Sequence, residues 1–138
     1  MTNMLAETGA MLTETQTKIV RALDEALEAF FAVDVLPTSG DLAAKHNEVV
    51  LRSLELQREF PKLAEQAVDY HDDEFPEEPE FTSGGPAAAL FELMLSLRSF
   101  MVAQKFSEFI RLRLNLRDEM ADVKSYSENW DWERGDWK

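Results

Sequence analysis

The stretch that decides the fold is PAAALFELMLSLRSFMVAQKF, residues 86–106. It approaches the length of a membrane span, but Glu92 and Arg98 lie inside it, and each charge costs about 2.5 kcal/mol or more at a helix centre in lipid. Between Leu90 and Val102 the predicted helix is apolar on nearly all sides. The stretch therefore predicts a helix that other helices or a second subunit surround, and no membrane association.

The helical period continues beyond this stretch, so we expect one long, central C-terminal helix over residues 86–125. Residues 110–117, IRLRLNLR, alternate apolar and basic residues with the period of a strand. The helical spacing from Phe106 through Phe109 to Leu116 passes through this segment, and it favours a helix there as well.

The first half of the chain predicts further amphipathic helices over residues 5–33 and 42–70. Thr13 and Gln16, three residues later, have the spacing of a capping box. The first helix therefore has an alternative start at Thr13. Pro61 interrupts the second run, and it predicts either a kink or a new helix with Pro61 in its first turn.

Two segments lack helical periodicity. Residues 71–85 contain two prolines and many acids, which predicts an irregular acidic loop, and residues 126–138 form an acidic, tryptophan-rich tail. The expected fold is all-α, a bundle of three to five helices, with one helical domain over residues 1–125 and the tail over residues 126–138.

Composition limits the possible functions. The net charge is −13 and the chain has no cysteine, so direct nucleic-acid binding, thiol redox chemistry and cysteine-based metal sites are all disfavoured. The first residues lack the basic and apolar regions of a signal peptide, which favours a cytoplasmic location.

Motifs for catalysis are weak. His46 lies on an apolar stripe, His71 precedes an acidic loop, and no histidine-centred triad is predicted. Glu25-x-x-Glu28 and Glu119-x-x-Asp122 match the paired acids of Mg-dependent all-α nucleotide hydrolases, but such short patterns are frequent in a chain with 27 acids. We expect no enzymatic activity, no cofactor and no metal.

The apolar surface of the long helix predicts self-association, with a homodimer as the expected assembly. The residues expected to form that contact are Leu90, Phe91, Met94, Leu97 and Met101.

Two surfaces are candidates for binding a protein partner, and their acidic residues favour a partner with a basic surface. The first is the tail, either as a peptide ligand or as a cap on the bundle, with Trp130, Asp131, Trp132, Glu133, Asp136 and Trp137. The second is an acidic surface of Asp72, Asp73, Glu74, Glu77, Glu78 and Glu80. The sequence favours a non-catalytic protein-interaction module of the adaptor, chaperone-like or inhibitory kind. The alternative is an acidic nucleic-acid mimic that blocks a nucleic-acid-binding protein, as in phage counter-defence or toxin immunity.

Overall fold

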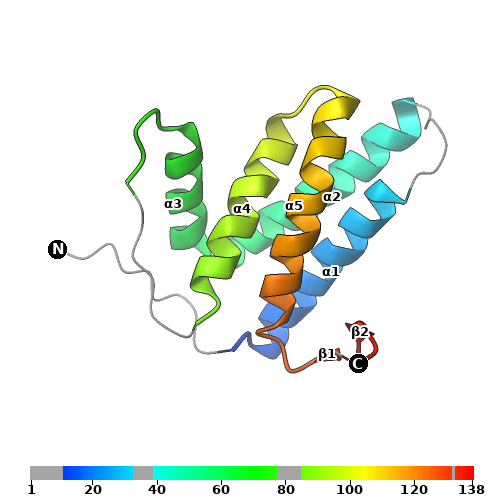
Figure 1. Cartoon of the computed structure of the whole chain (residues 1–138), viewed down its shortest axis with the longest axis vertical. Coiled ribbons are helices and arrows are strands. Elements are labelled where there is room, and N and C mark those ends of the chain that lie inside the picture. The colour runs from blue at the N-terminus through cyan, green and yellow to red at the C-terminus, as the bar shows by residue number, and fades with distance from the viewer. Residues whose placement is uncertain (1–10, 33–38, 78–84, 132) are drawn as a thin grey trace.

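Five helices account for most of the residues that the computed structural model describes, which are 11–32, 39–77, 85–131 and 133–138 (Figure 1). They are α1 (Glu14–Phe31), α2 (Ser39–Glu59), α3 (Pro61–Asp72), α4 (Ala87–Val102) and α5 (Phe106–Lys124). A short antiparallel pair of strands follows, β1 (Trp130–Asp131) and β2 (Asp136–Trp137). The predicted all-α bundle is confirmed.

The starts of α1 and α3 follow the sequence signals. The backbone N–H of Gln16 donates to the Thr13 hydroxyl at 3.1 Å, and the Thr13 N–H donates to the Gln16 side chain at 2.9 Å. These bonds form the predicted capping box, so α1 begins after Thr13. Pro61 opens α3 as a new helix, because proline has no N–H to donate and fits the first turn.

The single long helix expected over residues 86–125 is divided into α4 and α5 by Ala103–Lys105. Ala103 and Lys105 have extended backbone, and the Glu108 carboxylate accepts the N–H groups of Gln104 at 2.8 Å and Lys105 at 3.4 Å. A straight helix of that length would span about 60 Å and leave much of its apolar surface uncovered. The turn lets α5 fold back along α4 and cover it. Residues 110–117 are helical, as predicted.

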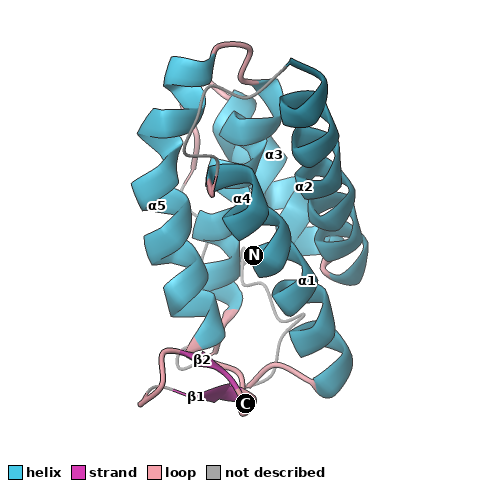
Figure 2. Ribbon diagram, turned by 90° about the vertical axis from the view of Figure 1, so that its right-hand side faces the viewer, coloured by secondary structure: helices cyan, strands magenta, loops and turns pink. Residues whose placement is uncertain are grey.

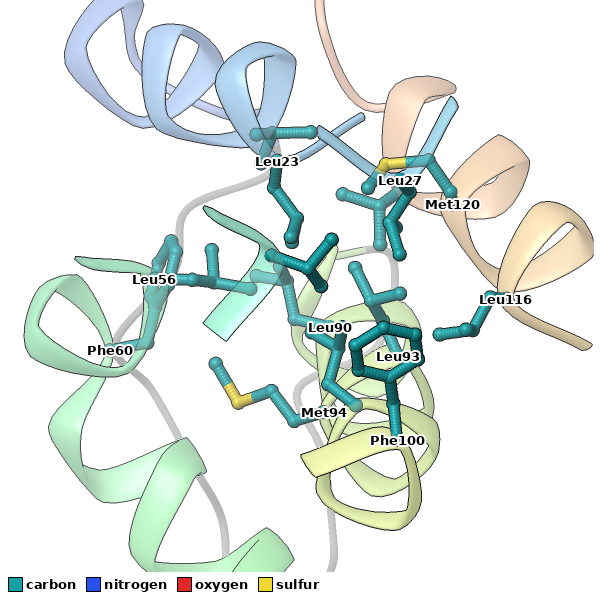
Figure 3. Packing of buried hydrophobic residues seen from close by; sticks show 14 of the residues in the cluster. Leu23, Leu27, Leu56, Phe60, Leu90, Leu93, Met94, Phe100, Leu116 and Met120 are labelled. Atoms are coloured by element: carbon teal, nitrogen blue, oxygen red, sulfur yellow. The ribbon is translucent and has the colours of Figure 1, made fainter. Parts of the chain in front are cut away.

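The core lies where α4 meets the other helices (Figure 3). Leu90, Leu93 and Phe100 of α4 are fully enclosed and meet side chains from α1, α2 and α5. Helix α2 packs mainly on α1, α3 mainly on α4, and α4 on α5. None of the helices in the described residues combines the length and the apolarity that crossing a membrane requires.

Candidate binding groove

The carboxyl-terminal strands lie at one end of the bundle, close to the ends of α1 and α5 (Figure 2). Their turn is built by Asp131, whose side chain accepts the N–H groups of Glu133 at 3.0 Å and Arg134 at 3.2 Å. Gly135 closes the turn with φ at 66°, a conformation that glycine adopts without steric cost. The turn directs Trp137 back toward α1.

Trp137 is only 6% exposed and joins the hydrophobic core. Its indole N–H donates to Asp24 of α1 at 3.1 Å, and its ring meets that of Trp130 edge to face at 5.2 Å. Lys124 of α5 completes the cluster, because its ammonium group binds Asp24 at 3.1 Å and lies 4.0 Å from the Trp130 ring centre. The tail thus ties α1 to α5 at this end of the bundle.

Beyond this cluster, α1 and α5 enclose a groove of about 280 Å³. Its apolar lining includes Leu27 of α1 and Met120 of α5, which Figure 3 shows side by side, together with Phe31 and Leu116. We call this space the α1/α5 groove. Its volume is enough for a few apolar side chains of a ligand.

The two walls of the groove carry opposite charges. The α1 wall has Glu28, and the α5 wall has Arg113 and Arg117. Burial in the groove raises the pKa of Glu28, and the nearby Asp24 carboxylate raises it further. Neither Glu28 nor Arg113 has an ion-pair partner among the described residues, so both charges are available to a ligand.

An exposed apolar stripe runs along α5 beside the basic wall. Phe106, Ile110 and Leu114 follow one another at four-residue spacing, and they are 41%, 49% and 58% exposed. Because residues four apart lie on one face of a helix, these side chains form a continuous strip next to Arg113 and Arg117. The strip widens the apolar surface beyond the groove itself.

The predicted tail residues divide between the core and the surface. Trp137 is buried, Trp130 and Asp131 are half-buried, and Glu133 and Asp136 are exposed. Trp132 lies outside the described residues. The buried indole of Trp137 fits a cap on the bundle, and the exposed carboxylates remain accessible to a partner.

The surface expected for self-association lies inside the protomer. Leu90, Phe91, Met94 and Leu97 are buried, and Met101 is half-buried, because α3 and α5 pack against α4. The chain itself therefore covers the surface that motivated a homodimer.

The acidic surface is partly engaged. Asp72 closes α3, whereas Asp73, Glu74 and Glu77 are exposed beyond it, and Glu78 and Glu80 lie outside the described residues. His71 and Arg98 hydrogen-bond to the carboxylate of Asp72, and these bonds lower its pKa. Asp72, although itself exposed, is thus tied to α4 and less available to a partner than Asp73, Glu74 and Glu77.

A histidine-centred line of hydrogen bonds, which the sequence did not predict, joins α3 to α4. His71 Nε2 lies 2.9 Å from the Ser99 hydroxyl, and His71 Nδ1 lies 2.8 Å from the Asp72 carboxylate. Sequence reasoning missed it because His71 and Ser99 are 28 residues apart, and only the packing of α3 on α4 brings them together.

The residues of the two paired acid motifs lie on different helices, Glu25 and Glu28 on α1 and Glu119 and Asp122 on α5. Within the described parts of the chain, no three His, Asp or Glu side chains gather closely enough to hold a metal ion. His46 stacks on Phe100 at 4.9 Å, in the core-edge environment that its position on an apolar stripe indicates.

Comparison of the chain with protein-family models, curated proteins and solved structures returned no match.

Proposed function

We propose that the protein is a protein-interaction module that holds an amphipathic segment of a partner in the α1/α5 groove. The observation that carries this proposal is an open apolar groove whose walls hold uncompensated charges of opposite sign. Grooves between helices are a recurrent way to bind an amphipathic peptide, with apolar anchors for affinity and flanking charges for orientation.

The chemistry of the groove specifies the partner segment. Apolar side chains fill the space over Leu27 and Met120, and a lysine or arginine of the partner faces Glu28. An acidic residue on the other edge of the segment faces Arg113. The net charge of −13 favours a partner that is basic overall, because long-range attraction speeds its association. The strip of Phe106, Ile110 and Leu114 extends the contact.

Affinity capture with charge-reversed variants tests this proposal. Glu28→Arg is expected to lose the partner, because the exposed carboxylate is replaced by a charge that repels the partner's base. The matched control is Glu25→Arg, which alters an exposed acid of the same helix outside the groove lining. Retention of the same partner by both Glu28→Arg and Arg113→Glu would show that the groove is not the binding site.

The second candidate function is nucleic-acid mimicry, and the exposed acids Asp73, Glu74 and Glu77 beyond α3 favour it. A basic nucleic-acid-binding protein would then bind these carboxylates in place of phosphates. The two functions respond differently to competition. A partner held by carboxylates alone is released by duplex DNA and by moderate salt, whereas a partner anchored in an apolar groove resists both. The triple variant Asp73→Asn, Glu74→Gln, Glu77→Gln should release only a mimic's partner.

A further inference from the structure

The hydrogen bonds of His71 match the tautomer that a general base needs. A carboxylate can only accept a hydrogen bond, so the contact with Asp72 places a ring proton on His71 Nδ1. In the neutral ring, His71 Nε2 is then the acceptor for the Ser99 hydroxyl. Arg98 donates to the other carboxylate oxygen of Asp72 at 3.0 Å and holds that group in place. Aspartate, histidine and serine in this order form the hydrogen-bonded relay of serine hydrolases.

Ser99 also has space around it for a substrate. It lines two adjoining hollows of about 310 Å³ and 400 Å³, which share Ser99, Leu112 and Asn115. One hollow is bordered by His71, and the other by Arg111. A small molecule spanning both would have its central atoms next to the serine, with one part on each side.

The lining also supplies groups that an acyl-transfer reaction uses. Asn115 of α5 borders both hollows, and its amide offers N–H donors for the negative charge that develops on a carbonyl oxygen. The hollow away from His71 is lined by both Arg111 and Glu108, so it offers polar contacts of either charge to the far part of a substrate. Leu112 gives the shared part of the lining an apolar surface.

We propose that Ser99 is a nucleophile activated by His71 and Asp72, and that the protein hydrolyses small acyl esters in these hollows. The Ser99 oxygen bonds to the ester carbonyl carbon while its proton passes to His71 Nε2. The bond to the alcohol oxygen then breaks, and the alcohol leaves with that proton. Water next gives a proton to His71 Nε2 and its hydroxyl to the acyl carbon. The bond from that carbon to the Ser99 oxygen then breaks, the acid leaves, and His71 returns the proton to the Ser99 oxygen.

This activity is separate from the proposed partner binding. Asn115 and Arg111 lie on the side of α5 that faces these hollows, whereas Arg113 and Arg117 line the α1/α5 groove. Loss of one activity therefore leaves the other measurable.

A neighbouring serine provides an internal control. Ser96 lies one turn before Ser99 on α4 and borders one of the same hollows, but its hydroxyl bonds to Glu119 rather than to a histidine. A hydrogen bond that only ties α3 to α4 gives Ser99 no greater reactivity than Ser96. A working relay makes Ser99 selectively reactive.

The experiment treats the full chain with a fluorophosphonate, which forms a covalent bond with activated serines, and maps the label by mass spectrometry. We expect one label, on Ser99, and release of p-nitrophenol from p-nitrophenyl acetate. Ser99→Ala should abolish both, and His71→Gln should slow labelling about 100-fold, within the range that a general base contributes. Ser107→Ala, which alters an exposed serine of α5 outside the lining of both hollows, should label at the wild-type rate.

Thermal melts of each variant establish that it is folded before it is assayed, and mapping the label on the wild-type chain needs no variant. An unlabelled wild-type protein would overturn the proposal. So would equal labelling of Ser96 and Ser99, or a His71→Gln variant that labels as fast as the wild type.

Discussion

The indole N–H of Trp137 donates to the carboxylate of Asp24 at 3.1 Å, across 113 residues of sequence. The same carboxylate oxygen binds the ammonium group of Lys124, also at 3.1 Å. A residue near the end of the chain therefore completes the polar contacts of a buried acid on the first helix. The tail belongs to the fold, and its removal should destabilise the packing of α1 and α5 together.

Trp137→Ala should lower the free energy of unfolding by about 3 to 5 kcal/mol, the usual cost of truncating a buried tryptophan. The ring is buried in the core, and its loss also leaves Asp24 with one hydrogen bond fewer. Urea denaturation measures the change. Phe75→Ala is the control, because that side chain is 82% exposed and its removal should leave stability unchanged. A Trp137→Ala variant as stable as the wild type would show that the ring does not pack on α1 in solution.

Asp24→Ala should destabilise the protein by about 3 to 5 kcal/mol, because it leaves the Lys124 charge buried and unpaired. The side chains of Lys124 and Asp24 are 10% and 9% exposed, so water replaces little of the lost interaction. The double variant Asp24→Leu, Lys124→Met should recover much of this loss, since it removes both charges together. Urea denaturation of the single and double variants gives both values. A double variant less stable than Asp24→Ala would contradict this account of the pair.

Ser53→Ala should stabilise the protein by about 1 kcal/mol. The Ser53 hydroxyl is enclosed in the core and has no hydrogen-bond partner among the described residues, and alanine removes that cost while favouring the helix. Ser127→Ala is the matched control, since the Ser127 hydroxyl is also buried but bonds to Thr17 at 3.1 Å. The free energy of unfolding of that variant should fall by about 1 kcal/mol. If both variants shifted the melting temperature in the same direction, the difference between an unpaired and a paired buried hydroxyl would be refuted.

Local structure could be read from the sequence where a short-range signal decides it. The capping box at Thr13 and the helix opened by Pro61 depend on residues within one turn, and each was one of the alternatives that the sequence offered. The turn at residues 103–105 was missed, because it contains neither glycine nor proline and the apolar period runs through it. Its stabilising contact, from Glu108 to the N–H groups before α5, forms only when the chain already turns there.

The candidate sites depend on which helices become neighbours, and helical periodicity does not specify that. Leu27 and Met120 were both assignable to apolar faces, yet their meeting across a groove follows from how α1 and α5 pack. The pairing of His71 with Ser99 requires the α4–α5 turn and the docking of α3 on α4. For the tail, the sequence left a ligand and a cap open and favoured the ligand slightly, whereas the contact from Trp137 to Asp24 supports the cap.

Glu119 should make stability depend on pH between about 4.5 and 7. Burial raises the pKa of this carboxyl group to about 7 from its ordinary value of 4.5, and the Ser96 hydroxyl donates to it. The folded protein thus binds a proton in this window that the unfolded chain has released, so this group's contribution to stability falls as pH rises from 4.5 through 7. Because the group is partly exposed, we expect an effect of about 1 kcal/mol rather than the full shift.

Glu119→Gln tests this expectation, because glutamine keeps an acceptor for Ser96 and never ionises. At pH 4 the variant and the wild type should be nearly equally stable, since the Glu119 carboxyl group is then mostly protonated in both the folded and the unfolded protein. At pH 8 the variant should be more stable by about 1 kcal/mol, since only the wild type carries the cost of a half-buried charge. Urea midpoints at the two pH values measure the difference, and the contributions of other titrating groups cancel in it.

Glu128→Gln, which alters an exposed acid, should show no such change between the two pH values. A Glu119→Gln variant that tracks the wild type at both pH values would mean that the carboxyl group is solvated and ionises normally.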